Sequence, residues 1–439
     1  MTGIDEPGVT ARVARRVSRG TDDIVVTSNR HRPVASGGDA AAVATPIDSL
    51  PVVVERFEAR RRTLRVAVVT ETWPPEVNGV AMSIARVVAG LQARDHAIQL
   101  VRPRQHADEE REPDAGLEAV LTRGLPIPNY PNLRLGVPAR RALVRLWSER
   151  RPDVVHLATE GPLGWSALQA ATHLRLPTSS DFRTNFHAYS GHYGVGWLRR
   201  PIAAYLRRFH NRTRLTMVPT DGLRRELAAS GFRNLAVVGR GVDTDRFHPG
   251  RRDPALRAAW GAGPDDPVLI HVGRVAAEKN LGLLVRTYAR IRAVSPRARL
   301  VLVGDGPMVS ELRALCPDAV FCGTRSGDEL AAHYASGDVF LFPSLTETFG
   351  NVTSEALASG LAVVAFGYAA AAQLIRDGVD GSLVSFGDEV AFEAAAVRVV
   401  TDGALRVRVR AAAPDAVARL GWSGVVERLE TLLLGLAAP

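Results

Sequence analysis

Lysine is almost absent from this chain. One lysine, Lys279, stands among its 55 Lys and Arg residues, so every other basic position is an arginine. Cysteine is nearly as rare, because the chain has only Cys316 and Cys322. Two cysteines cannot build a disulfide framework, and the sequence holds no Cys/His cluster with the spacing of a zinc site. We therefore predict two reduced thiols.

Long apolar runs are also missing. No stretch of about 18 apolar residues is present, which argues against an integral membrane protein. The arginines near the N-terminus are followed by no apolar segment of the kind found in secretory signals. We expect a cytoplasmic protein, with peripheral binding at the inner face of the cell membrane as a second option.

The net charge of +9 is spread over 439 residues. It suits anionic partners in general, such as phosphorylated substrates or an anionic membrane surface, without selecting one. Nucleic acid is not an expected partner, because zinc-finger spacing, RNA-binding aromatic signatures and a basic recognition helix are all missing. Nothing in the sequence indicates an oligomeric state.

The length exceeds what one hydrophobic core usually supports, so we expect two domains. Short β-branched runs alternate with helical patterns from residue 64 onward, and the pattern restarts after a Pro/Gly/Asp-rich stretch. This alternation is typical of parallel βαβ units. We predict an α/β protein with two Rossmann-like, doubly wound domains that face each other across a cleft. The expected division is a poorly ordered leader in 1–62, the two domains in 63–245 and 246–415, and a C-terminal helix in 416–439 that packs back on the first domain.

The expected elements follow from these runs. In the first domain they are strands at 64–69, 97–101, 153–158, 214–218 and 235–239, with helices near 79–94, 162–174, 198–211 and 221–230. In the second they are strands at 267–273, 298–304, 319–323, 338–344 and 361–366, with helices near 280–294, 307–315, 326–336 and 351–359.

Each domain opens with a strand that runs into a glycine-containing turn. In the second domain, Arg274 and Lys279 follow this strand, and a planar guanidinium with a compact ammonium suits the oxygens of a diphosphate. In the first domain, Gly79 begins a helix, where backbone N–H groups suit an anion, although a purely structural turn would use the same residues. Neither turn has the pattern of a nicotinamide or ATP-hydrolysis motif.

The most informative stretch is "FPSLTETFGNVTSEALASG", residues 342–360. A strand ends here, Glu347 lies in the loop, and Gly350 and Asn351 begin a helix whose amides at 350–352, including that of Val352, point outward. Glu355 follows eight residues after Glu347. The two carboxylates can accept hydrogen bonds from the hydroxyls of two different sugars, and the free amides of the helix start can donate to a sugar hydroxyl or a phosphate oxygen.

These motifs together resemble the retaining GT-B-fold glycosyltransferases of family 4, also called group 1. The matching stretches are "VNGV", "HVGRVAAEKNL", "LVGDGP", "DVFLFPSLTETFG" and the Glu-x7-Glu pair, and they cover residues 64 to about 435. Within the family the chain is most similar to bacterial GDP-mannose-dependent alpha-mannosyltransferases and to sulfolipid-synthase-like enzymes.

The resemblance implies a role for each cation. Arg274 and Lys279 would bind the donor diphosphate and stabilise the charge that builds as it leaves. Gly79 would lie against the donor phosphate from the other domain. The transferred sugar would keep its anomeric configuration.

The resemblance also implies roles for the Glu-x7-Glu region. Glu355 would hold the ribose hydroxyls of the nucleoside. Glu347 would bind the transferred sugar together with the backbone at Gly350 and Asn351.

One segment departs from the family pattern. Relatives often carry a histidine in an "FHT" turn of the first domain, but this chain reads "SDFRTNFHAYSGHYG" and has Arg183 there. His187 follows four residues later and is retained as a catalytic candidate, against the alternative that it packs on its aromatic neighbours.

"DTD" at 243–245 resembles a manganese motif of another fold, but two carboxylates are weak metal evidence. We predict no metal and no cofactor.

The sequence therefore predicts a hexosyltransferase that moves mannose from GDP-mannose to a lipid or glycan acceptor. A UDP-sugar is the second donor option. Two other classes stay open: a sugar-nucleotide epimerase, and a protein that binds nucleotide sugars without catalysis. The basic amphipathic helix at 198–212 either rests on anionic lipid or packs its apolar face on its own sheet.

Overall fold

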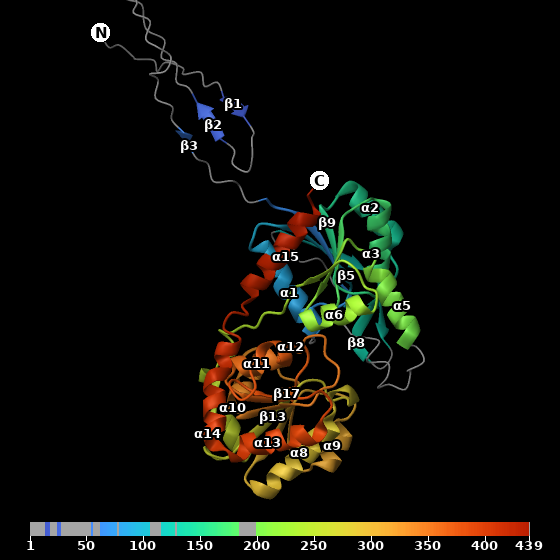
Figure 1. Ribbon diagram of the computed structural model, residues 1–439. Coiled ribbons are helices and arrows are strands. Elements are labelled where there is room, and N and C mark those ends of the chain that lie inside the picture. Colours follow the sequence, from blue (N-terminus) through green and yellow to red (C-terminus); the bar gives the residue numbers. More distant parts are fainter. Residues whose placement is uncertain are drawn as a thin grey trace, which may run out of the picture. The chain divides into compact units, whose positions relative to one another are not determined.

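The computed structural model describes residues 62–76, 79–105, 116–127, 130–183 and 199–438, together with three short strands nearer the N-terminus (Figure 1). The chain divides into two units, Met1–Arg62 and Thr63–Pro439. In the first unit, β1 (Ala14–Val17), β2 (Ile24–Thr27) and β3 (Val54–Glu55) form an antiparallel sheet. The expectation of a poorly ordered leader falls mostly outside the described residues.

The second unit begins with a seven-stranded parallel sheet in the order β12-β11-β10-β9-β4-β5-β6. We call this sheet and its helices the first lobe. Its strands are β4 (Arg65–Val69), β5 (Ala97–Pro103), β6 (Leu117–Thr122), β9 (Val154–Leu157), β10 (Thr178–Asp181), β11 (Leu215–Val218) and β12 (Leu235–Val237). A separate hairpin of β7 (Gly124–Ile127) and β8 (Tyr130–Gly136) follows β6.

Helices cover both faces of this sheet. On one face α1 (Gly79–Gln92) packs beside α15 (Trp422–Leu436), so the last helix of the chain belongs to the first lobe (Figure 1). The other face carries α2 (Arg140–Glu149) and α3 (Pro162–His173). Near β10 and β11 lie α5 (Arg199–His210) and α6 (Asp221–Ala229).

A six-stranded parallel sheet, in the order β15-β14-β13-β16-β17-β18, forms the second lobe. Its strands are β13 (Val268–Val272), β14 (Arg299–Val303), β15 (Val320–Gly323), β16 (Val339–Phe342), β17 (Ala362–Phe366) and β18 (Ser382–Val384). One face carries α8 (Leu281–Val294), α9 (Val309–Leu315), α13 (Glu389–Thr401) and α14 (Gly403–Ala412). The other carries α7 (Pro254–Ala259), α10 (Gly327–Ser336), α11 (Asn351–Ala358), α12 (Ala369–Leu374) and the 3-10 helix η5 (Ala413–Ala416).

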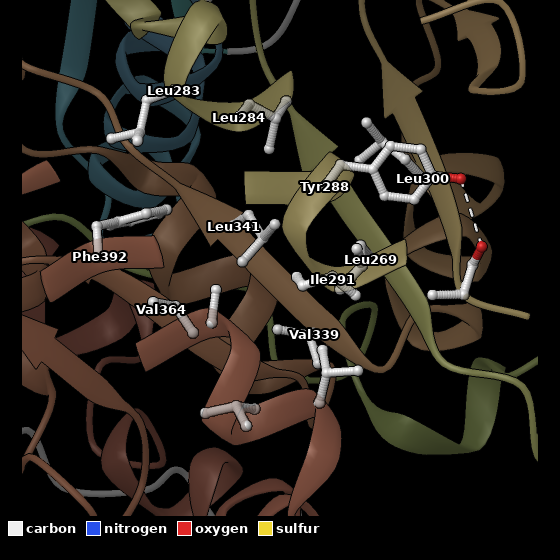
Figure 2. Close-up of a cluster of buried hydrophobic side chains, with 14 of the residues drawn as sticks. Leu269, Leu283, Leu284, Tyr288, Ile291, Leu300, Val339, Leu341, Val364 and Phe392 are labelled. Carbon is white, nitrogen blue, oxygen red and sulfur yellow. Dashed lines mark hydrogen bonds between the residues drawn. The ribbon is translucent and has the colours of Figure 1, made fainter. Parts of the chain in front are cut away.

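The core of the second lobe shows why these segments form strands and helices. Figure 2 shows Leu284 and Ile291 of α8 facing Leu341 and Leu269 of the sheet. Every residue of β13 is buried, as expected for a parallel strand covered on both faces. In α8 the buried side chains recur at helical spacing, which pins one face of the helix to the sheet.

Both sheets have a topological switch point, which is the place where ligands bind in open α/β sheets. In the first sheet it lies between β4 and β9, and in the second between β13 and β16. The predicted α/β class with two Rossmann-like sheets is confirmed. The boundaries proposed between the domains stay predictions. Among the described residues, no helix is long and apolar enough to cross a membrane.

Candidate active site

Lys279 lies at the switch point of the second sheet. It ends the short 3-10 helix η4 (Ala277–Lys279), in the segment that joins β13 to α8. Its ammonium donates a hydrogen bond to Oε1 of Glu347, and the two side chains are only 12% and 11% exposed. The nitrogen also lies 5.5 Å from the centre of the Phe342 ring, within reach of a cation–π interaction. Partners from β16 and its loop therefore hold the only lysine of the chain.

The loop that carries Glu347 is braced by hydrogen bonds. The Ser344 hydroxyl donates to the same Oε1 of Glu347 at 2.7 Å, and the Tyr368 hydroxyl donates to the Ser344 carbonyl at 2.9 Å. The backbone N–H of Leu345 donates to the carbonyl of Glu278 at 3.3 Å. The loops after β13 and β16 are therefore joined by backbone as well as by charge.

Arg274 has a partner that the sequence analysis did not predict. Its Nε lies 3.0 Å from Oε1 of Glu278, whose side chain is 1% exposed. The Arg274 side chain itself is 38% exposed. One edge of the guanidinium is therefore fixed by a buried carboxylate while the side chain still reaches solvent. Its role toward a diphosphate stays a prediction.

Two glycines of "LVGDGP" allow the backbone after β14 to come close to the backbone on either side of Arg274. A Cβ on Gly304 would lie 1.9 Å from the carbonyl oxygen of Gly273, and one on Gly306 would lie 2.3 Å from that of Val275. Only glycine fits at such distances, so this motif supports the backbone that carries Arg274.

Helix α11 begins beside the loop of Glu347. Its N-cap Gly350 has a φ of +90°, a conformation that favours glycine, and no side chain caps the helix. The first amides, of Asn351 and Val352, therefore have no side-chain acceptor at the N-cap. A Cβ on Gly79, at the start of α1, would lie 3.4 Å from Nδ2 of Asn351. The structure thus brings the starts of α1 and α11 together.

Glu355 lies further along α11 and is held through one carboxylate oxygen. The Tyr334 hydroxyl of α10 donates to its Oε2 at 2.9 Å. Burial raises the pKa of Glu355 from 4.5 to about 7, and the hydrogen bond from Tyr334 limits that rise. No hydrogen bond joins Oε1 to a described residue, so this oxygen is available to a ligand.

A buried ionic cluster lies at the carboxyl end of β10 in the first lobe. Nη2 of Arg183 lies 2.5 Å from Oδ2 of Asp181, and these side chains are 2% and 1% exposed. Nη2 of Arg240 lies 3.6 Å from Oδ1 of the same aspartate, and Nε2 of His156 lies 3.7 Å from Oδ2. Burial alone would raise the pKa of Asp181, but the charges of Arg183 and Arg240 hold it well below its usual value. Burial lowers the pKa of Arg183 to about 10, against the opposing effect of Asp181.

Arg183 occupies the position where relatives often carry a histidine, and its side chain is committed to the buried cluster. Its backbone carbonyl accepts a hydrogen bond of 2.9 Å from the Thr348 hydroxyl. Thr348 follows Glu347, so the end of β10 contacts the loop of the second lobe. His187 lies outside the described residues, and its proposed role stays a prediction.

Two carboxylates follow β4 and β9 at the switch point of the first sheet. Oε1 of Glu71 accepts a hydrogen bond of 2.7 Å from the N–H of Leu163, near the start of α3. Burial raises the pKa of Glu71 to about 7, with a smaller contribution from the nearby Glu160. Glu160 is buried, and its Oε1 lies 3.3 Å from Nε2 of His210.

The helix considered for lipid binding packs its apolar face inward. In α5, Leu206 and Phe209 are 1% and 0% exposed and belong to the core of the first lobe. Arg200, Arg207 and Arg208 are exposed. Leu206 and Phe209 are therefore used by the core and not available for insertion into lipid, while the arginines remain available for contact with an anionic surface.

The "DTD" stretch has an ordinary structural role. Oδ2 of Asp243 lies 2.5 Å from Nη2 of Arg86. The part of the chain that the structure describes contains no group of three or more His, Cys, Asp and Glu side chains placed to hold a metal.

Known proteins resemble this chain along most of its length. Residues 77–246 match the family Glycosyltransferase Family 4, and residues 266–402 match Glycosyl transferases group 1. A GDP-mannose-dependent alpha-mannosyltransferase of Corynebacterium glutamicum is 33% identical over 84% of this chain and 88% of its own. One of Mycobacterium tuberculosis is 38% identical over 69% of this chain and 79% of its own. The chain belongs to the family 4 glycosyltransferases.

Solved structures of other proteins share the fold of this glycosyltransferase. Sucrose-phosphate synthase from Thermosynechococcus elongatus aligns over 85% of this chain and 99% of its own, with a TM-score of 0.69 and 18% identity. At that identity the likeness concerns the GT-B fold alone. The predicted family and enzyme class, a hexosyltransferase, are confirmed by the family matches and the named relatives.

Sequence reasoning missed several polar residues of this glycosyltransferase. Glu71 and Glu160 come within a few residues of strand ends, and that position was a usable signal because carboxyl ends of parallel strands meet at one edge. Asp181 had no such signal, because the strand that it ends was not predicted. Tyr334 lies on a predicted helix and reads as an ordinary core aromatic.

Proposed function

We propose that this enzyme is a retaining mannosyltransferase that uses GDP-mannose and transfers the sugar to a lipid or glycan acceptor without a metal ion. The observation that carries the proposal is the pairing of Lys279 with Glu347 at the switch point, next to the uncapped start of α11. The two relatives named as GDP-mannose-dependent alpha-mannosyltransferases favour this donor.

In the proposed reaction the bond between the sugar C1 and the diphosphate oxygen breaks, and a bond from C1 to the acceptor oxygen forms on the same face. The acceptor hydroxyl passes its proton to the departing diphosphate oxygen. Negative charge grows on the diphosphate as C1 separates. Lys279 and the first amides of α11 stabilise that charge, and preorganised donors of this kind contribute several kcal/mol in other enzymes.

Glu347 has two functions in this scheme. It orients Lys279 through one oxygen, and it accepts a hydroxyl of the transferred sugar. Glu355 accepts the ribose hydroxyls through Oε1, the oxygen that Tyr334 leaves available. Arg274, fixed on its inner edge by Glu278, contributes a second positive charge beside the diphosphate.

We also propose that the enzyme contacts an anionic membrane peripherally, where it would meet a lipid acceptor. The support is the exposed arginines of α5 and of the residues after it. They are Arg200, Arg207, Arg208, Arg212 and Arg214. Flotation with phosphatidylglycerol liposomes should show binding that weakens with salt, because exposed charges are screened. Absence of binding, or binding indifferent to salt, would argue against the membrane contact.

A donor screen tests the main proposal. Purified protein is titrated with GDP-mannose, UDP-glucose, GDP and UDP, and its melting temperature is recorded, since a bound ligand stabilises the native state. Mass detection then follows sugar transfer to an acceptor with and without EDTA. The expected result is stabilisation by GDP-mannose and EDTA-resistant transfer, with the anomeric configuration of the product retained by NMR.

Other results of the screen separate the alternatives. Stabilisation by UDP-glucose alone would replace the donor. Conversion of the nucleotide sugar without an acceptor would indicate an epimerase. Binding without release of any nucleoside diphosphate would indicate a protein that only binds nucleotide sugars.

A further inference from the structure

Tyr334 is a core tyrosine whose hydroxyl faces the candidate donor site. The side chain is 0% exposed and lies on α10, whose core face packs against the second sheet. Its ring meets the Phe247 ring edge-on at 5.7 Å and tilts against Phe340 at 6.0 Å, which fixes its orientation. The only hydrogen bond recorded for its hydroxyl, among the described residues, goes to Oε2 of Glu355 at 2.9 Å.

A buried tyrosine hydroxyl needs a hydrogen-bond partner, but phenylalanine would fill the same space without one. The hydroxyl is therefore not explained by packing. It anchors one oxygen of Glu355 and leaves the other without a described partner. This arrangement fixes the direction in which the second oxygen accepts a hydroxyl.

We infer that Tyr334 is a positioning residue for donor binding: its hydroxyl orients the Glu355 carboxylate and favours its charged form, which accepts the vicinal diol of a nucleoside diphosphate ribose. The inference rests on the proposed role of Glu355 in the donor site. It assigns a function to a side chain that would otherwise count as core.

The protonation of Glu355 supports the inference. Burial raises the pKa of Glu355 to about 7, and the hydrogen bond from Tyr334 opposes this rise because it stabilises the charged form. Loss of the hydroxyl would raise the pKa further, so that less carboxylate is present at neutral pH. A protonated carboxyl has fewer acceptor sites for the ribose hydroxyls.

The titratable groups on the elements around Glu355 do not replace the effect of Tyr334 on the pKa of this carboxylate. The elements packed against α11 are α10, α12, β17 and η5. Their titratable residues besides Tyr334 are Asp328, Glu329 and His333 on α10 and Asp415 on η5. None of these four contributes to the pKa shift of Glu355, and Asp328, Glu329 and Asp415 are exposed.

Substitution Tyr334→Phe tests the inference, because it removes the hydroxyl and keeps the ring. Binding of GDP is measured by calorimetry at pH 7, 8 and 9, with UDP as a parallel probe. At pH 7 the variant should bind GDP about tenfold more weakly, as expected for one lost hydrogen bond to a charged group. By pH 9 the difference should shrink to about threefold or less, because both proteins then carry an ionised Glu355. The last phosphate ionisation lies near pH 6, so the charge of the diphosphate stays nearly constant over this range, and any ionisation of the base affects both proteins equally.

Tyr288→Phe is the matched control. Tyr288 (Figure 2) is also buried in the second lobe, but it belongs to the core on the other face of the sheet from Tyr334, and its hydroxyl donates to the Ala298 carbonyl and to Asp318. This control should bind GDP as the wild type does at every pH. The combination Tyr334→Phe/Glu355→Gln should bind no worse than Glu355→Gln alone, because the hydroxyl acts through that carboxylate.

Deoxyribose analogues provide a readout that a packing role would not move. The wild type should lose affinity when GDP is replaced by its 2′-deoxy or 3′-deoxy form, and Tyr334→Phe should lose less at pH 7. The inference would be overturned if Tyr334→Phe weakened the binding of GDP and of its deoxy forms by the same factor. It would also be overturned if the loss of GDP affinity in Tyr334→Phe did not change with pH. A wild type that binds neither GDP nor UDP would instead overturn the proposed function.

Discussion

The ammonium of Lys279 and the carboxylate of Glu347 form an almost buried ion pair across the switch point of the second sheet. The pair joins two residues that are 68 positions apart in the chain. Breaking a buried pair by removing one partner leaves the other charge uncompensated. The site is therefore organised around a compact positive charge, which a lysine supplies and the planar arginine guanidinium would not.

Substitution Lys279→Ala should lower kcat by at least about 100-fold, the typical cost of losing one oxyanion donor. Lys279→Arg should restore little, because the larger planar cation cannot take the same position between Glu347 and the Phe342 ring. Steady-state transfer measures both variants, and circular dichroism verifies that they are folded. Turnover near that of the wild type in a folded Lys279→Ala protein would contradict the assigned role.

Thr348 tests whether the contact between the lobes matters for turnover. Thr348→Val keeps the shape but removes the hydrogen bond to the Arg183 carbonyl, which should lower kcat about fivefold, the equivalent of roughly 1 kcal/mol for a neutral hydrogen bond. The Kd for GDP should stay unchanged. Thr348→Ser retains the hydroxyl and serves as the control. Equal kcat in all three proteins would show that this contact is dispensable.

The packing of α15 on α1 gives a prediction whose sign is not obvious. Alanine is usually favoured over glycine inside a helix by about 1 kcal/mol. At Gly90, however, a Cβ would lie 2.5 Å from Cγ2 of Val426, which is itself 2% exposed. Gly90→Ala should therefore destabilise the protein by about 1–3 kcal/mol through overpacking, measured by urea unfolding.

The contact between Gly90 and Val426 can be tested by a double-mutant cycle, and α15 also offers a control substitution. Val426→Ala makes room for the new methyl group, so the double variant should lose less stability than the sum of the single ones. Gly424→Ala lies on the exposed side of α15 with no atom within 4 Å and should not destabilise. Additive losses in the cycle would show that the two helices separate rather than compete for space.

The strands show which part of the fold the sequence could reveal. Those of the second sheet through β17 were predicted because their residues are mostly apolar, as in β17 (Ala362–Phe366), where all five residues are also buried. Strand β10 (Thr178–Asp181) was missed, although all four of its residues are buried. It is polar throughout, and its burial depends on distant partners such as His210, whose Nδ1 lies 2.9 Å from Oγ of Ser180. A hydrogen-bond network of this kind cannot be predicted from the local sequence pattern.

The candidate site divides in the same way. The segments that follow β13 and β16 and carry Lys279, Glu347 and Glu355 could be found from the motifs, because carboxyl ends of parallel strands gather ligand-binding groups. The partner of each side chain could not, because the ion pair and the Tyr334 hydrogen bond connect different elements. Arg183 illustrates the limit: the sequence showed that it stands where relatives often carry a histidine, but not that its guanidinium pairs with the buried Asp181.

Asp181 sets a stability prediction with a defined pH dependence. Asp181→Asn removes the negative partner of Arg183 and Arg240, whose side chains are 2% and 7% exposed. Two guanidinium groups would then remain buried without their counter-ion, and such a change costs about 3–5 kcal/mol in other proteins. Urea unfolding at pH 7 should show a loss of this size, and no loss would contradict the role of the cluster.

The same measurement at low pH determines the origin of the effect. The folded-state pKa of Asp181 is held well below the value of about 3.9 for an unfolded chain, so its contribution is complete above that value. As the pH falls below about 4, the unfolded state binds the proton first, and the contribution is progressively lost toward the lower folded-state pKa. The stability gap between the wild type and Asp181→Asn should therefore narrow from pH 4 downward. Asp221→Asn, an exposed aspartate paired with Arg224, should show no measurable change at pH 7. A gap that stays constant to pH 2 would mean that shape, and not charge, explains the loss.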